Sequence, residues 1–218
     1  MAAISPASRL VAAAARERLR PLGLRPRGRS RLWLDDHGWW LGVVEFPSPQ
    51  WSQGSGLTVG VMWLWQDVGH VTFDFVERAQ GTELFRNEMQ FASVAAELAS
   101  TAERQVNGIR DRFADLNAVA RCLLSRPARP GFLWDSFNAG VAAGLVCDAA
   151  AARKRLTAVL AEDPFADWVR EAQQTARDLL DVADDVAVVQ DWARAAVISC
   201  RSKLGLGDVP ESAGDLFA

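Results

Sequence analysis

The spacing of apolar residues changes twice along this chain, and these changes constrain the fold more than any other feature. Apolar positions recur at helical spacing up to about residue 20, alternate over residues 31–76, and return to helical spacing from about residue 83. A helix followed by strands and then by helices is the pattern of the α+β class. We therefore predict an α+β protein with an N-terminal helix packed on an antiparallel sheet, followed by a helical bundle.

The alternating region predicts four strands. They are expected over residues 31–35, 39–46, 57–66 and 70–76. Asp35-Asp36-His37-Gly38 and Asp67-Val68-Gly69 predict tight turns, because Asp and Gly tolerate the positive φ that such turns require. Pro, Ser and Gly over residues 47–56 indicate a loop between the second and third strands. Short connections in this order predict a four-stranded antiparallel β-meander, covered on one face by the first helix and by part of the helical region.

The remainder predicts a bundle of about five helices. Their expected ranges are 83–107, 109–125, 132–160, 164–182 and 186–204, with breaks at Gly, Pro and paired Asp residues. We expect residues 1–82 to form a helix-plus-sheet subdomain and residues 83–204 a helical subdomain packed on it. Residues 205–218 are rich in Gly, Pro, Ser and acids, which predicts a flexible tail.

Composition narrows the class of protein. No apolar run approaches the ~20 residues of a membrane helix, and Arg9 interrupts any signal-peptide core, so a cytoplasmic protein is expected. The scarcity of Lys beside abundant Arg and Ala suggests a bacterial genome. Three widely spaced cysteines without a CxxC pair indicate neither a disulfide framework nor a zinc site. A net charge of −3 gives no global field for nucleic acid.

Catalytic motifs are absent, which favours a protein that is not an enzyme. The chain has no GxSxG, HExxH, P-loop or GxGxxG pattern, and no cofactor is predicted. It has two histidines, and the meander would place their turns at one rim of the sheet. Imidazoles and carboxylates there would suit zinc, iron or manganese, although turns favour the same residue types for their backbone alone. The alternative function is therefore a metal-dependent enzyme or metal binder, with a site that consists of His37, His70, Asp35 and Asp67.

The N-terminal segment is strongly basic. Residues 1–31 hold eight arginines against one glutamate, while the C-terminal third is acidic. Such ends can attract each other within a fold, or the basic segment can bind phosphates. The second interpretation gives a nucleic-acid-binding alternative, which we consider the less favoured one. Its residues are Arg20, Arg25, Arg27, Arg29 and Arg31.

Tryptophan is the most unusual component, with nine residues, six of them in the predicted sheet and its loop. Most are expected in the core, because indole rings bury large areas. Trp51 differs because it lies in a polar, Pro-, Ser- and Gly-containing loop. The area of its ring favours a lid over the core, and its loop position alternatively predicts an anchor for a partner. The partner-binding candidates are Trp51, Ser52, Gly54 and Ser55.

Several motifs resemble a bacterial family known as domain of unknown function 4304. The resemblance rests on Leu-Gly-Leu followed by a basic segment and Gly over residues 22–28, on Trp-Ser-x-Gly-Ser over 51–55, and on Val59-Gly60. It is clear over residues 15–76 and looser to about residue 205. Leu24 stands where the family usually has Phe. Relatives often occur near conflict and immunity genes, which implies an immunity or defence accessory role through binding of another protein.

Overall fold

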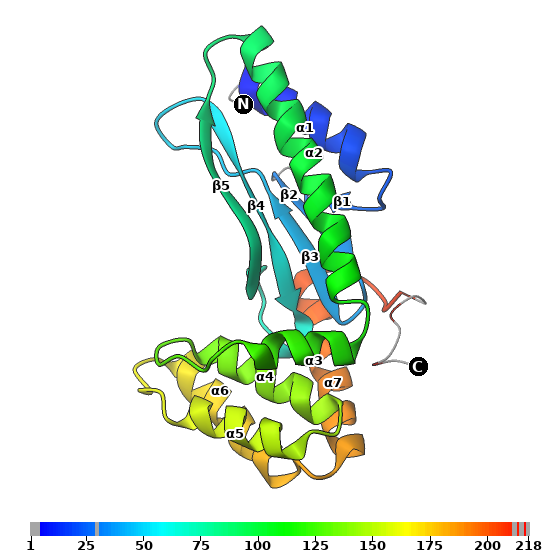
Figure 1. Cartoon of the computed structure of the whole chain (residues 1–218), viewed down its shortest axis with the longest axis vertical. Helices are drawn as coiled ribbons and strands as arrows, with labels where there is room; N and C mark the ends of the chain where they lie inside the picture. The colour runs from blue at the N-terminus through cyan, green and yellow to red at the C-terminus, as the bar shows by residue number, and fades with distance from the viewer. Residues whose placement is uncertain (1–4, 29–30, 211–212, 214–215, 217–218) are drawn as a thin grey trace. The chain divides into compact units, whose positions relative to one another are not determined.

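The expected change from helix to sheet and back to helix is confirmed in the computed structural model, which describes residues 5–28, 31–210, 213 and 216 (Figure 1). Its elements in chain order are α1 (Pro6–Leu19), β1 (Arg25–Pro26), β2 (Leu32–Asp36), β3 (Trp40–Glu45), β4 (Gly54–Trp63), the 3₁₀ helix η1 (Leu64–Gln66), β5 (Phe75–Leu84), α2 (Glu88–Arg112), α3 (Leu116–Ser125), α4 (Leu133–Leu145), α5 (Ala149–Leu160), α6 (Asp167–Asp181) and α7 (Val186–Leu204).

The chain forms two units. The sheet unit comprises Met1–Met62 and Thr72–Asp111, and the helical unit comprises Trp63–Val71 and Arg112–Ala218. A single boundary after residue 82 was expected, and the observed division differs from it in two ways. The helix α2 belongs to the sheet unit, and the short segment after β4 belongs to the helical unit. The reason is packing: α2 buries its apolar face within the sheet unit rather than within the bundle.

The sheet keeps the sequential order that a meander requires, β1-β2-β3-β4-β5. β2 and β3 pair antiparallel and are joined by the predicted turn, in which the His37 amide donates to the Trp40 carbonyl at 3.0 Å. Gly38 completes this turn with a positive φ of 84°. The expectation of four strands is corrected to five, because the pair Arg25–Pro26 adds a short edge strand beside β2.

β4 and β5 depart most from the predicted strands. β4 begins at Gly54 and ends at Trp63, and the chain then turns through η1, so no strand covers residues 64–66 or 70–74. Backbone carbonyls of β5 lie over three glycines of β4, where an added Cβ would come within 2.3–2.8 Å of an oxygen. These close approaches accompany two irregularities in the β4–β5 register. Glycines that indicate a loop in the sequence therefore allow two strands to approach here.

α1 and α2 lie alongside each other, next to the sheet (Figure 1). Ser5 caps α1 by accepting a hydrogen bond from the Ser8 amide, as the Ser-Pro start predicts. Ion pairs Arg9–Glu88 and Arg18–Glu103 join the two helices, so they run parallel. α2 continues through Gly108, where a break was expected, because this exposed glycine has no capping signal beside it.

In the helical unit, α4 is the central helix. It contacts α3, α5, α6 and α7, and its residues from Ser136 to Leu145 are all buried. Gly140 allows α5 to approach, because an added Cβ would lie 2.8 Å from Leu156. The single helix expected over residues 132–160 is therefore wrong. It ends at Leu145, and Cys147 adopts a positive φ of 65° before Asp148 caps α5.

The described part of the tail accepts hydrogen bonds from arginines of α7, and its predicted flexibility stays a prediction. The Arg201 guanidinium, almost fully buried, donates to the carbonyls of Gly207 and Asp208, and Arg194 donates to the carbonyl of Leu216. Leu216 is buried as well. The composition of the tail did not reveal these contacts, in which arginine N–H groups donate to backbone carbonyls of the tail.

Across the described residues, none of the helices combines the length and the apolar character needed to cross a membrane.

Candidate functional site

The loop between β3 and β4 carries the residues that the sequence assigns to partner binding. Trp51 is 89% exposed, so the expectation that its ring covers the core is wrong. Ser52 is exposed beside it. Gly54 and Ser55 are instead buried inside β4, and the Ser55 hydroxyl donates to the neighbouring Gly56 carbonyl. The structure therefore places two of the four candidates on the surface and two within the strand.

The loop is tied at both ends. The Gly56 amide donates to the Pro47 carbonyl at 2.9 Å, and the Phe85 amide donates to the Gln53 carbonyl at 2.9 Å. The Arg31 guanidinium spans the base of the loop through the Gly54 carbonyl at 3.1 Å. These bonds fix the residues that flank Trp51, so its indole projects from an anchored segment.

Two further apolar side chains are exposed near this loop and were missed from the sequence. Leu84 pairs with Gly54 at the end of β5, and Met89 lies in the first turn of α2. Leu84 precedes and Met89 follows Phe85, whose amide donates to the Gln53 carbonyl of the loop. The sequence does not mark either residue as an exposed apolar side chain, because Leu84 ends a polar strand and Met89 follows the charged Glu88. We call Trp51, Leu84 and Met89 the apolar tip of the sheet unit.

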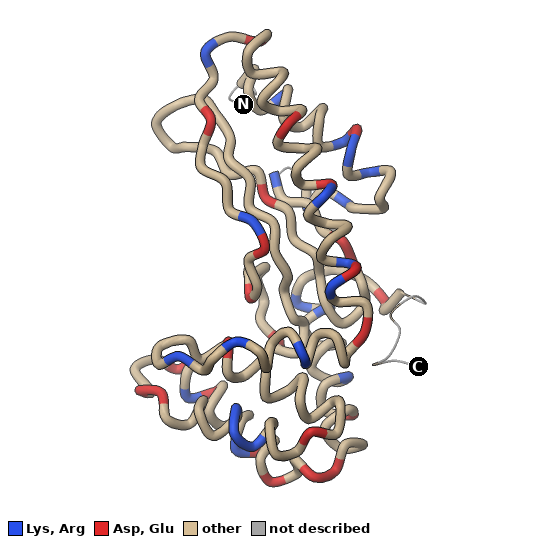
Figure 2. The backbone as a smooth tube through the Cα atoms, viewed as in Figure 1, with Lys and Arg blue, Asp and Glu red and all other residues tan. Residues whose placement is uncertain are grey.

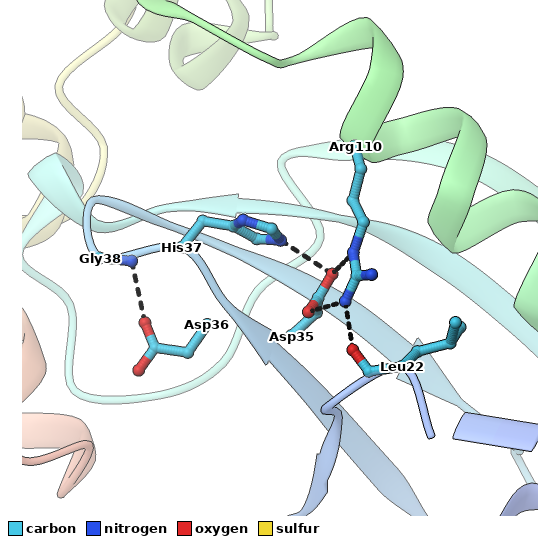
Figure 3. A network of polar contacts seen from close by, with 6 residues as sticks. All are labelled: Leu22, Asp35, Asp36, His37, Gly38 and Arg110. Atoms are coloured by element: carbon cyan, nitrogen blue, oxygen red, sulfur yellow. Dashed lines mark hydrogen bonds and ion pairs between the residues drawn. The ribbon is translucent and has the colours of Figure 1, made fainter. Parts of the chain in front are cut away.

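A buried carboxylate lies at the centre of a polar network in the sheet unit (Figure 3). Asp35 is only 5% exposed and accepts two hydrogen bonds from Arg110, at 2.8 Å from Nε and 2.7 Å from a terminal nitrogen. That same terminal nitrogen donates to the Leu22 carbonyl at 2.7 Å. Gly42 lies opposite Asp35 in β3, and its missing side chain leaves room for the carboxylate.

His37 completes this network. Its Nε2 lies 2.8 Å from Asp35 Oδ2, and its ring stacks on Trp40 with centroids 3.9 Å apart. Among the described residues, Asp35 is the hydrogen-bond partner of the imidazole, and no Ser, Thr or Cys side chain joins it. An Asp–His pair without a nucleophile does not form a catalytic triad. The arrangement acts as a clamp that joins the α1–β1 connection, β2 and α2.

Electrostatics support the clamp interpretation. Burial alone would raise the pKa of Asp35, but hydrogen bonds from Arg110 and His37, together with their charges, hold that pKa below its ordinary value. The hydrogen bond to Asp35 in turn raises the pKa of Arg110. Both partners therefore stay charged at neutral pH, which suits a structural ion pair rather than a proton-transfer group.

The other proposed metal ligands belong to a different part of the fold. Asp67 follows η1 with a positive φ of 55°, and exposed His70 lies in the connection to β5, not at a hairpin tip. His37 belongs to the sheet unit, whereas Asp67 and His70 belong to the helical unit. Within the described residues, no group of three or more His, Cys, Asp or Glu side chains could hold a metal ion.

The arginines of the nucleic-acid alternative have different environments. Arg20 and Arg25 are exposed, Arg27 is half-buried, and Arg29 lies outside the described residues. Arg31 donates to backbone carbonyls and to the Ser8 hydroxyl, and burial lowers its pKa.

Acidic side chains also lie near this basic segment. Figure 2 shows basic and acidic positions interspersed along α1 and α2, which matches the ion pairs between Arg9 and Glu88 and between Arg18 and Glu103. The basic segment is therefore partly neutralised within its own unit. Neither ion pair involves one of the five candidate arginines, so the nucleic-acid alternative stays a prediction.

Comparison of the chain with models of protein families, with curated proteins and with solved structures found no match. Membership of the family that the N-terminal motifs resemble therefore stays a prediction, and the interpretation of the site depends on its geometry.

Proposed function

We propose that this chain is a non-enzymatic protein-interaction module that binds another protein through the apolar tip of the sheet unit. The observation that supports this most is the 89% exposure of Trp51. An indole left in water at a loop apex forgoes the burial that stabilises most tryptophans. Such a side chain is the type that most often dominates binding energy at protein interfaces.

The anchored loop strengthens this proposal. Hydrogen bonds at both ends of the loop limit the conformational entropy that Trp51 would lose on binding. Leu84 and Met89 extend the apolar area beyond one ring, which suits a partner with an apolar pocket for the indole and an apolar rim around it. Trp51 contributes little to the fold, so it can be removed without unfolding the protein.

A quantitative affinity purification tests the proposal. Tagged wild type, Trp51→Ala and Phe165→Ala are used as baits in extract from the source cells. Phe165 is a matched control because it is a 73% exposed aromatic residue of the helical unit. We expect a protein enriched by the wild type and by Phe165→Ala, with affinity for Trp51→Ala reduced by about 30-fold, equivalent to about 2 kcal/mol. Identical binding by all three baits would contradict the proposal.

A further inference from the structure

The helical unit contains a pocket that the sequence does not indicate. It has a volume of about 450 Å³ and is lined by η1 with the turn that follows it, α4, α6 and α7. This volume is in the range of sites for small molecules. Five aromatic side chains line it: Trp65 from η1, Trp134 and Phe137 from α4, Trp168 from α6 and Trp192 from α7.

The four aromatic side chains from α4, α6 and α7 contact one another in a continuous series. Trp134 stacks on Trp168 with centroids 6.0 Å apart, and Phe137 meets Trp134 at 5.3 Å and Trp192 at 6.4 Å, both edge to face. Trp168 remains 44% exposed despite its stacking partner. Aromatic faces attract cations as well as apolar groups, because the ring quadrupole places negative charge above the ring.

A buried amide network sets the polarity at one end of the pocket. The indole of Trp65 can only donate, and its Nε1 lies 2.9 Å from Asn138 Oδ1. That oxygen also lies 3.1 Å from Gln66 Nε2, so Gln66 uses its amino group for Asn138. Its Oε1 has no hydrogen-bond partner among the described residues. Since Gln66 lines the pocket, this end offers a hydrogen-bond acceptor to a ligand.

Charge distinguishes among classes of ligand. Three charged side chains line the pocket: Asp67, Glu171 and Lys203. Lys203 Nζ lies 2.8 Å from Asp67 Oδ1 and donates to the Asp67 carbonyl at 2.9 Å, so its charge is balanced locally. Glu171 is exposed on α6, and its carboxylate has no ion-pair partner in the described part of the chain. The pocket therefore has an excess of one negative charge next to its aromatic wall.

We propose that this pocket binds a small organic cation with a flat apolar body, such as an aromatic quaternary ammonium compound. The aromatic wall would contact the body and the cationic group, Glu171 would balance the positive charge, and Gln66 Oε1 would accept a hydrogen bond where the cation has an N–H. This site lies within the helical unit, whereas the protein-binding proposal concerns the sheet unit, so either can fail without the other.

Benzyltrimethylammonium is the probe that tests this site, with phenylacetate as the anionic and benzyl alcohol as the neutral comparison. Each compound is titrated to about 10 mM into ¹⁵N-labelled full-length protein, and the indole N–H resonances are followed by NMR. We expect the cation to bind with a Kd of about 1 mM or tighter and to shift the Trp168 resonance. The Trp51 resonance should not move. The variants Trp168→Ala and Trp51→Ala assign the two signals.

Matched variants locate the binding. Trp168→Ala should weaken binding of the cation by about tenfold, and Glu171→Gln by about threefold. Asp181→Asn removes the same charge from the exposed end of α6, outside the pocket, and should leave the Kd unchanged. Equal binding of phenylacetate, absence of any shift at 10 mM, or unchanged affinity in both pocket variants would each overturn the proposal.

Discussion

Removing half-buried Arg110 should strongly destabilise the sheet unit, because it leaves the charge of Asp35 buried. The substitution Arg110→Leu deletes two hydrogen bonds to Asp35 and one to the Leu22 carbonyl. Asp35, which is 5% exposed in the unaltered protein, then keeps His37 as its hydrogen-bond partner. Breaking a buried ion pair from one side costs about 3–5 kcal/mol. Since the Arg110 side chain is 29% exposed, we expect about 3 kcal/mol.

A double-mutant cycle isolates this effect. Asp35→Asn removes the charge but keeps the shape that fits opposite Gly42. When Arg110 is already replaced by Leu, Asp35→Asn has no ion pair left to break. It instead removes the charge that lost its arginine partner, so its cost in unfolding free energy should be smaller than in the wild type. The two substitutions should therefore be strongly non-additive, with a coupling free energy of about 2 kcal/mol.

Urea unfolding at pH 7, followed by far-UV circular dichroism and indole fluorescence, measures the cycle. For a unit of this size, a slope of about 1.5 kcal/mol/M converts 3 kcal/mol into a midpoint lower by about 2 M. Two transitions are fitted if the probes do not coincide, because the chain has two units. An Arg110→Leu loss below about 0.5 kcal/mol, or simple additivity of the two changes, would refute the clamp.

Three further outcomes follow from other contacts. Folding lowers the pKa of Asp35, so the ionised carboxylate stabilises the folded protein fully above its unfolded pKa of about 3.9. This stabilisation is lost as the pH falls through the folded pKa. Urea midpoints measured at decreasing pH should show the loss, and the loss should be smaller in Asp35→Asn. Gly60→Ala should cost about 3 kcal/mol by thermal unfolding, because its Cβ would lie 2.3 Å from a carbonyl oxygen of β5, whereas Gly69→Ala, with open space around it, should be nearly neutral. Asn138→Ala should cost about 3 kcal/mol in the same assay, because it leaves the Trp65 indole and a neighbouring amide unsatisfied in the core.

The first half of the sheet could be predicted because its signals are local. Alternation and the Asp-Asp-His-Gly turn located β2 and β3 within one or two residues. β5 could not be found in the same way. It is an edge strand in which Glu77, Arg78 and Glu83 interrupt the alternation, so no apolar period marks it. Edge strands in general carry charges that discourage pairing with other chains.

The predicted boundaries of strands and helices were wrong where contacts between distant residues determine the local structure. Gly54 and Gly56 look like loop residues, yet they form β4 because β5 passes too close for a side chain. Leu64 and Trp65 continue an apolar strand pattern in the sequence. In the structure they form part of η1, and their side chains are buried in the helical unit. Asp148 did offer a local signal for a new helix, since its side chain caps α5.

The candidate sites show the same contrast. The composition of its loop identified Trp51 as unusual, although its exposure became known only from the structure. Arg110 lies 75 residues from Asp35 in the sequence, and no local pattern joins them. The aromatic pocket is made from four separate elements. In the sequence, Trp134 and Trp168 lie on the apolar faces of their helices and Trp192 fits no clean apolar face, so no local pattern joins them.

Site-specific photo-crosslinking from position 51 tests most directly whether the exposed indole contacts a partner. A photoreactive phenylalanine analogue replaces Trp51 in one variant and Phe165 in a control variant, both produced in the source cells. The proposed protein-binding role of Trp51 predicts a discrete adduct with one other protein from position 51 and none from position 165. Irradiation that gives no adduct at position 51, or the same adducts at both positions, would contradict it.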